Sequence, residues 1–401
     1  MPGSRRRGGT RTRTRSDACP GAWRRHDAAD GALARFRPVG GAVSAAELRI
    51  LAGAALGGGS ALEVTSRGSL QVRGLDPRTA DDLADAMRRL PAGPDPSRGA
   101  PLLDGEGRDV PCTVLASART PVADAAARFV ADALRGREDV PGRLLVALDD
   151  SSGDVAAEGA DITVVVGGDG EPATLRLDDV DVGLAHPDAG TLALAAIEAF
   201  LAVRGDAWRL ADLDDGVARV AEHLRRQESR FTGTQRQESR FPDIGAGAPH
   251  LGVGDDGVLE VMPRLGELDL ATVGVLVDLL DGPGHGAVLR LTPRRTLVLR
   301  GLADPHAALG RLAGLVETRA GSPWASLSAC VGAPRCAKAH ADVRGELTAA
   351  VATGHAGGGR VPAHWIGCHR GCGTPGGRVA VVEALPTGGY RTVVRAGRVT
   401  R

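Results

Sequence analysis

The chain has 401 residues, enough for two or three domains with hydrophobic cores of their own. Its 49 basic and 49 acidic side chains cancel, so overall charge indicates neither a nucleic acid nor a membrane surface as partner. Six cysteines in a chain of this length argue against a disulfide scaffold. No apolar run reaches the length of a membrane helix, so we expect a cytoplasmic protein with no membrane partner.

The first 18 residues are rich in Arg and lack the apolar stretch of a secretory signal. We therefore predict a disordered basic arm. A nucleic-acid-binding tail is the alternative, although nothing else in the chain supports it.

Two segments share one layout, Pro38–Leu75 and Pro263–Leu302. Each has a Gly-containing turn, an amphipathic helix, a strand, a turn with Thr-x-Arg, and a second strand that ends in Arg-Gly-Leu. Helices are expected after each copy, at Pro77–Leu90 and Asp304–Glu317. Because only two copies exist, we expect them to pack on each other about a pseudo-two-fold axis.

Another α+β unit is predicted between the copies. Its expected strands are Leu144–Leu148, Ile162–Val166 and Ala173–Leu177, and its expected helices are Pro121–Leu134, Thr191–Val203 and Gly216–Gln227. Next, Arg226–Phe231 is repeated as Arg236–Phe241. This polar stretch, with few apolar residues, is predicted to be a linker.

Four cysteines near the C-terminus carry the strongest chemical signal. Cys330 and Cys336 form a C-x5-C pair, and Cys368 and Cys372 form a C-x3-C pair. Four thiolates from two short loops suit a four-iron four-sulfur cluster, which takes one sulfur per iron. Zinc is the first alternative, but its structural sites usually use tighter pairs. The other alternative, four unrelated buried cysteines, fits poorly with the glycines and prolines around each pair, which indicate loops.

These motifs resemble those of a known family. Cys330–Ala339 and His364–Pro375 are similar to the cluster motifs of the nitrite and sulfite reductase superfamily and, within it, to those of the precorrin-3B synthases. Arg370 and Ile366 stand where that family typically has Lys and Ser. The remaining cysteines, at positions 19 and 112, are not expected to be ligands.

Two further stretches, Thr65–Gly74 and Leu291–Thr296, resemble the arginine-bearing turns of the superfamily. The resemblance implies an α+β fold, nitrite/sulfite reductase-like, with two ferredoxin-like half-domains related by a pseudo-two-fold axis and two α+β lobes. The expected division is an arm at 1–18, half-domains at 19–110 and 247–320, a lobe at 111–228, a linker at 229–246 and an iron–sulfur cluster lobe at 321–401.

The resemblance also implies an activity. It is the oxygen-dependent hydroxylation of precorrin-3A at C20 with γ-lactone formation, a monooxygenase step of aerobic cobalamin biosynthesis. The expected cofactor is a 4Fe-4S cluster on the four cysteines, with a mononuclear iron as a further candidate. The expected partners are a tetrapyrrole substrate, dioxygen, and NADH or a reduced electron-carrier protein.

Two alternatives stay open. The first is a sirohaem-dependent sulfite or nitrite reductase. The lysine-bearing element of the anion pocket in those reductases corresponds here to Val140–Val146, which has no lysine. The second alternative is a non-catalytic protein, either an iron–sulfur electron carrier or a zinc-stabilised binding protein.

Cationic side chains are expected to bind the carboxylates of a tetrapyrrole, because Arg pairs bidentately with carboxylate. The candidates are Arg67, Arg73, Arg294, Arg295, Arg335, Lys338 and Arg370. A solvated Arg-rich surface is the alternative. Equivalent turns carry Arg67 and Arg294, so we expect them on opposite sides of one cleft. The resemblance implies that Cys372 lies at its floor. Two histidines near the second pair, His364 and His369, are candidates for acid–base catalysis or iron binding.

Overall fold

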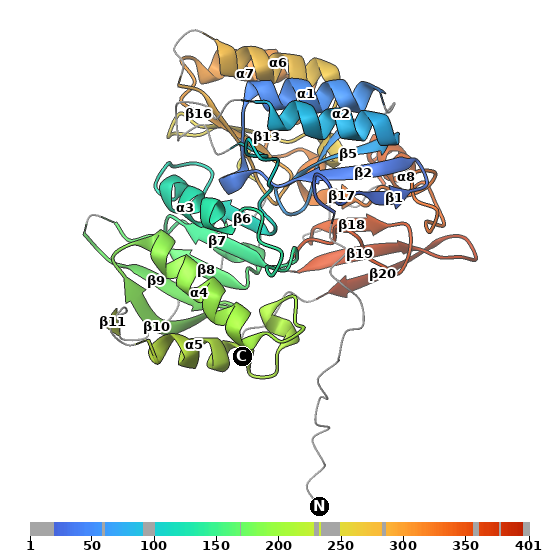
Figure 1. The fold of residues 1–401 in the computed structure, drawn as a ribbon. Helices are drawn as coiled ribbons and strands as arrows, with labels where there is room; N and C mark the ends of the chain where they lie inside the picture. The colour runs from blue at the N-terminus through green and yellow to red at the C-terminus, as the bar shows by residue number, and fades with distance from the viewer. Residues whose placement is uncertain are drawn as a thin grey trace, which may run out of the picture.

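The computed structural model describes residues 20–57, 61–90, 101–168, 170–227, 232–233, 249–282, 286–355, 361–376 and 378–395. The predicted basic arm, Cys19 and most of the predicted linker lie outside the described residues. The described strands form four sheets, which Figure 1 shows with their covering helices.

Two five-stranded sheets have equivalent strand orders. The first runs β1 (His26–Ala28), β2 (Gly31–Phe36), β5 (Leu70–Leu75), β4 (Leu62–Val64) and β14 (Glu267–Leu268). The second runs β12 (Gly252–Val253), β13 (Leu259–Val261), β16 (Leu297–Arg300), β15 (Val288–Leu291) and β3 (Ala42–Val43). Each half thus donates one short strand to the edge of the other half's sheet. The predicted duplication and its pseudo-two-fold arrangement are confirmed.

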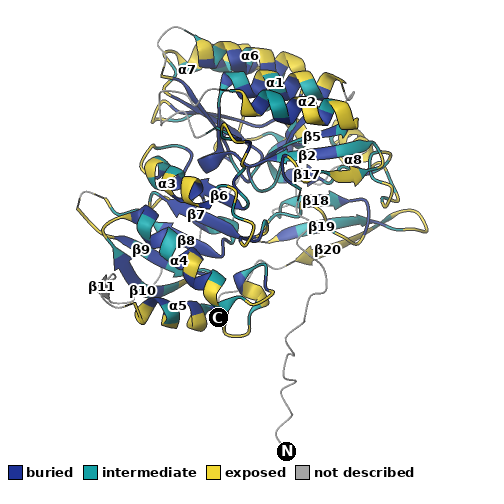
Figure 2. Cartoon of the chain, in the orientation of Figure 1, coloured by how far each residue is buried: buried dark blue, intermediate teal, exposed yellow. Residues whose placement is uncertain are grey.

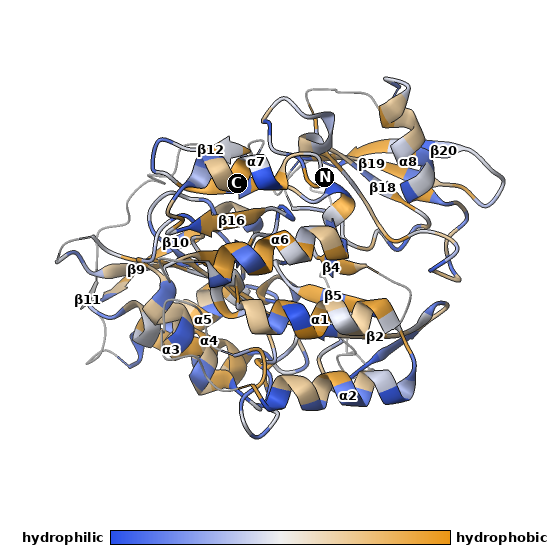
Figure 3. Cartoon of the chain, turned by 90° about the horizontal axis from the view of Figure 1, so that it is seen from above, coloured by the Kyte–Doolittle hydropathy of each residue, from blue (hydrophilic) through white to orange (hydrophobic). Residues whose placement is uncertain are grey.

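The helices of the two halves form one layer over these sheets. They are α1 (Ala45–Gly57), α2 (Pro77–Arg88), α6 (Leu270–Asp281) and α7 (Pro305–Leu312). Seen from above in Figure 3, α6, α1 and α2 lie side by side. Apolar side chains of the helices and of both sheets form a single core, which includes Leu48, Leu51, Leu70, Leu276 and Leu299.

The helix starts follow from local capping. Asp76 precedes Pro77 and accepts a hydrogen bond from the backbone of Thr79, and Asp304 does the same for α7. Proline is tolerated at the first helical position, because its missing N–H has no partner there. The ends come earlier than predicted, and in α7 the chain turns at Gly314, whose φ is +86°.

The first lobe is a six-stranded sheet. Its order is β11 (Thr232–Gly233), β10 (Val180–His186), β9 (Ala173–Leu177), β8 (Ile162–Val165), β7 (Leu145–Asp149) and β6 (Thr113–Ala116). Its helices are α3 (Asp124–Leu134), α4 (Ala189–Val203) and α5 (Gly216–Arg225), and their side chains share a core with the sheet. The three predicted strands and three predicted helices are present, whereas β6 and β10 were not predicted.

The C-terminal lobe has a four-stranded sheet of β17 (Leu327–Ala329), β18 (Ala363–Ile366), β19 (Val379–Ala384) and β20 (Tyr390–Arg395), with α8 (Val343–Ala352) packed on β17 and β18. Figure 2 shows that most strands of the half-domains and the first lobe are buried, while β20 is largely exposed. Within the described ranges, no helix combines the length and the apolar character needed to cross a membrane. The predicted domain boundaries remain a proposal. They divide the chain by sequence, whereas β3 and β14 each pair with a strand of the other half.

Candidate functional site

The two cysteine loops leave the same edge of the C-terminal sheet. Its strands β17 and β18 are adjacent and parallel, and Cys330 and Cys368 follow their C-terminal ends within two residues. Parallel neighbours end at one edge, so the local topology brings both pairs together. Backbone hydrogen bonds join the loops, from Cys330 to Trp365 at 2.9 Å and from His340 to Gly367 at 2.8 Å.

All four cysteines line one cavity of about 610 Å³. Burial raises the pKa of the Cys372 thiol, and the neighbouring thiols of Cys330, Cys368 and Cys336 raise it further. By contrast, Cys112 is fully buried in the first lobe, where burial raises its thiol pKa to about 12. The structure therefore separates the four loop cysteines from Cys112.

The surroundings of the sulfur atoms suit an iron–sulfur cluster. The backbone N–H of Gly367 donates to Cys330 Sγ at 3.2 Å, and such hydrogen bonds tune cluster potentials. Among these four described cysteines, no three sulfur atoms lie within 4.8 Å of one another. Tetrahedral zinc, with Zn–S bonds of about 2.3 Å, would hold its sulfurs about 3.8 Å apart. The four sulfur atoms, as placed, therefore do not have the spacing of a tetrahedral zinc site.

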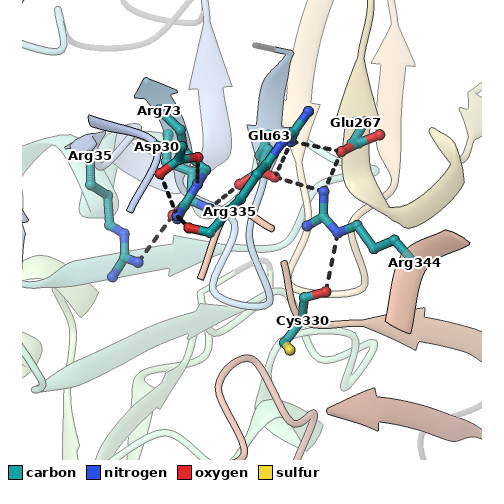
Figure 4. Close-up of polar contacts among 9 residues, drawn as sticks. Asp30, Arg35, Glu63, Arg73, Glu267, Cys330, Arg335 and Arg344 are labelled. Carbon is teal, nitrogen blue, oxygen red and sulfur yellow. Dashed lines mark hydrogen bonds and ion pairs between the residues drawn. The ribbon is translucent and has the colours of Figure 1, made fainter. Parts of the chain in front are cut away.

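Arginines from the half-domain reach the first cysteine loop (Figure 4). Arg73 donates two hydrogen bonds to Asp30, at 3.0 and 3.1 Å, and one to the carbonyl of Arg335 at 3.2 Å. The side chain of Arg335 in turn donates to Glu267 at 3.2 Å. The predicted residues Arg73 and Arg335 therefore lie in the cavity wall, but each is already paired with protein groups.

Arg344, which the sequence did not predict, lies at the centre of this network. It donates to Glu63 at 2.7 Å, to Glu267, and to the carbonyl of Cys330 at 3.2 Å. Burial alone would raise the pKa of Glu63, but Arg344, Gln71 and Arg73 hold it below its usual range. In the sequence, the indication of this network was Glu63, a charged residue between two apolar residues of the short strand β4.

Two predicted residues hold the backbone of the second cysteine loop. Arg295 donates to the carbonyl of Gly373 at 3.0 Å. His364 is fully buried, with Nδ1 2.8 Å from Ser328 Oγ and Nε2 3.0 Å from the carbonyl of Cys372. Burial, followed by Arg295, lowers the pKa of His364 to about 3, so the ring is neutral. Its Nε2–H must donate to the carbonyl, and Nδ1 accepts from the serine.

This geometry corrects the expectation for both histidines. Both ring nitrogens of His364 are engaged with protein groups, so its position is that of a positioning residue and not of an acid–base catalyst. His369 is exposed and is not part of the cavity wall in the described structure.

Arg294 also departs from expectation. It lines a separate cavity of about 60 Å³, where its Nε lies 3.5 Å from Glu158. The next residue, Arg295, is the one that reaches the larger cavity. The structure does bring together Arg67, Arg73, Arg295, Arg335, Lys338 and Arg370 with the four cysteines.

Comparison with known proteins agrees with these motifs. The chain is 27% identical over 412 residues to a protein of Sinorhizobium sp. named precorrin-3B synthase, covering 96% of this chain and 84% of that one. Its structure resembles that of the Mycobacterium tuberculosis NirA protein, with a TM-score of 0.65 at 20% identity, over 90% of this chain and 73% of the other. No protein-family model matches the chain. The predicted resemblance to precorrin-3B synthase and the predicted nitrite/sulfite reductase-like fold are thereby confirmed.

Proposed function

We propose that this chain is a precorrin-3B synthase, an oxygen-dependent monooxygenase that hydroxylates precorrin-3A at C20 and forms a γ-lactone in cobalamin biosynthesis. One observation carries the proposal: among the described residues, four cysteines on two joined loops share a cavity with eight cationic side chains and two carboxylates. A tetrapyrrole rimmed with carboxylates is the complementary ligand.

The cysteines Cys330, Cys336, Cys368 and Cys372 would hold a 4Fe-4S cluster at one wall of this cavity. When bound, the cluster supplies electron transfer from an external reductant, NADH or a reduced carrier protein. The reductant provides two electrons, so that one oxygen atom of dioxygen enters the product and the other leaves as water.

The chain's own residues position this chemistry. Arg344 fixes the carbonyl of Cys330, while Arg295 and His364 fix the second loop at Gly373 and Cys372. The cavity volume of about 610 Å³ lies within the range of small-molecule sites, roughly 300–1,000 Å³. Its cations would orient the macrocycle through its carboxylates.

The sulfite or nitrite reductase alternative has less support. The segment that corresponds to the lysine-bearing anion element has no lysine. Val140, Pro141 and Gly142 line a different groove, of about 990 Å³, together with Trp23 and Trp208. Reduction of a small oxyanion needs dense positive charge at the reacting atom, and the cation of this segment, Arg143, lies over the ring of Trp208.

The proposal is tested by anaerobic purification followed by incubation with precorrin-3A, a reductant and ¹⁸O-labelled dioxygen. We expect the broad absorption of an iron–sulfur cluster without sirohaem bands, and a product that contains one labelled oxygen atom. Sirohaem bands together with rapid sulfite reduction and no reaction of precorrin-3A would overturn the proposal in favour of the reductase.

A further inference from the structure

The cationic side chains of the 610 Å³ cavity divide into two groups. Six of them donate to acceptors of the protein, and these are Arg35, Arg67, Arg73, Arg295, Arg335 and Arg344. Their partners include carboxylates for three of the six, at Asp30, Glu63 and Glu267. Each of those three would have to leave a carboxylate of the protein to bind one of a ligand.

Lys338 and Arg370 differ from these six. Both are exposed, and among the described residues neither makes a hydrogen bond or an ion pair. The Arg370 guanidinium acts on the nearby Cys372 thiol, whose pKa it lowers against the larger effect of burial. Since neither side chain has a partner in the fold, neither is needed to stabilise it.

Lys338 and Arg370 each lie two residues from a cysteine of their own loop. Lys338 follows Cys336 by two residues, and Arg370 lies midway between Cys368 and Cys372. Each cysteine loop therefore carries one unpaired cation, and the backbone bond from His340 to Gly367 joins the loops. Both cations line the same cavity as all four cysteines.

Composition bias does not account for Lys338. The chain has 49 basic residues, of which Lys338 is the only lysine. An Arg-rich surface would place arginine here as it does elsewhere. An ammonium on a flexible four-carbon stem can follow a mobile carboxylate, whereas the planar fork of Arg370 binds one in a fixed orientation.

We propose that Lys338 and Arg370 form the carboxylate-binding pair of the cavity, which takes an acetate or propionate group of the macrocycle and seats it over the cysteine loops. This rests on the proposed tetrapyrrole function. A competing role would be to offset the negative charge of a bound cluster, and it predicts a change in reduction potential instead of a change in ligand affinity.

The test uses the cluster-loaded protein, purified anaerobically at low ionic strength, with uroporphyrin as a non-reacting polycarboxylate probe and precorrin-3A as substrate. The variants are Lys338→Gln, Arg370→Gln and the double variant. Arg78→Gln, an exposed arginine on α2 outside the cavity, is the matched control. We expect each single change to weaken binding about fivefold and the double change about twentyfold, with unchanged iron content.

Two further results sharpen the test. Lys338→Arg keeps the charge and should bind within about twofold of the wild type, and added salt should shrink all these differences. Wild-type affinity in the double variant, or an altered reduction potential with unaltered affinity, would overturn the assignment while leaving the proposed function intact. A wild-type protein that binds neither ligand would overturn the proposed function and this assignment with it.

Discussion

The half-domain that begins at Pro38 and the one that begins at Pro263 repeat each other's turns closely. The first turn has φ +57° at both Gly40 and Leu265, and the hairpin turn has φ +63° at Gly68 and +62° at Arg295. This left-handed conformation favours glycine and costs other residues roughly 1–2 kcal/mol. The second copy accepts that cost at two positions, and both side chains line the 610 Å³ cavity.

Buried charges at equivalent strand positions are opposite in sign. Glu63 occupies the middle of β4 and pairs with Arg344 of the C-terminal lobe. Arg290 occupies the same position in β15 and pairs with Asp124 of the first lobe at 2.6 Å. The repeat therefore has one backbone but two charge patterns, and each pattern selects a different lobe.

The faces beside these charges differ in the same way. The first half lines most of one wall of the cavity of about 610 Å³, to which the second half contributes Leu265 and Arg295, whereas the second half lines a further cavity of about 60 Å³. Arg35 and Gln71 of the first half are replaced by Glu260 and Val298 in the second, and the first lobe covers them. The comparison teaches that apolar periodicity determines the shared fold, whereas a few polar positions determine which half holds a site.

The largest expected effect comes from removing either buried charge. Glu63→Leu leaves the buried Arg344 with Glu267 as its one carboxylate, and Arg290→Leu leaves the buried Asp124 with Arg300 alone. Each change should lower the free energy of unfolding by about 1.5–3 kcal/mol. Only Glu63→Leu should also speed iron release to a chelator, because Arg344 binds both Glu63 and the Cys330 carbonyl. Equal rates of iron release in the two variants would contradict this difference between the halves.

The pH dependence of Glu63 sharpens the same point. Its folded pKa lies below the usual value, so its charge stabilises the fold above about pH 4.3, and that contribution is lost as pH falls through the folded pKa. The melting temperature of Glu63→Gln should lie below that of the wild type near neutral pH, and the two should converge in acid. The control is Glu158→Gln. Burial raises the pKa of Glu158, so this change should not lower the melting temperature near neutral pH relative to that in acid.

Equivalent arginines of the hairpin turns should differ in ligand binding. Arg67 lines the larger cavity, but it already donates to the Arg143 carbonyl. Arg67→Ala should therefore weaken binding of a polycarboxylate tetrapyrrole about threefold, less than the loss of Lys338 or Arg370. Arg294 faces Glu158 instead, so Arg294→Ala should leave this affinity unchanged and lower stability. Titration of both variants with uroporphyrin checks the pair, and an equal loss in both would restore the symmetric cleft predicted from the sequence.

The smallest expected effects on stability concern the left-handed turn positions. Gly68→Ala should cost about 1 kcal/mol of unfolding free energy, because the added Cβ meets only ordinary contacts, the nearest 3.4 Å away at Leu291. Arg295→Gly should relieve a similar strain while losing the hydrogen bond to Gly373. We expect near-wild-type stability but faster loss of the cluster, as measured by denaturation and iron release.

Much of the fold followed from local patterns. The helices predicted after each Arg-Gly-Leu begin within one residue of α2 and α7, and apolar alternation predicted the hairpin strands. The strand β10 was missed because Gly183, with φ +66°, and a register shift between Asp181 and Ala185 interrupt its alternation. The short strand β6 was missed because its residues after Thr113 are all apolar, so it shows no alternation of polar and apolar residues.

The site was less predictable, because it depends on partners far apart in the chain. The cysteine spacings indicated two loops, and parallel β17 and β18 bring these loops together. Whether an arginine is available for a ligand depends on contacts such as Arg73 with Asp30 and Arg344 with Glu63, 43 and 281 residues apart. No local pattern distinguishes Arg294 from Arg295, since the turn geometry alone directs one side chain into the cavity.

The central claim is that Cys330, Cys336, Cys368 and Cys372 hold one 4Fe-4S cluster beside the tetrapyrrole cavity. Its most direct test is the iron and acid-labile sulfide content of anaerobically purified wild-type protein, with Cys372→Ser and Cys112→Ser as matched variants. We predict about four irons and four sulfides per chain in the wild type and in Cys112→Ser, and a large loss of both in Cys372→Ser. A single zinc in place of iron, or full iron content in Cys372→Ser, would contradict the account.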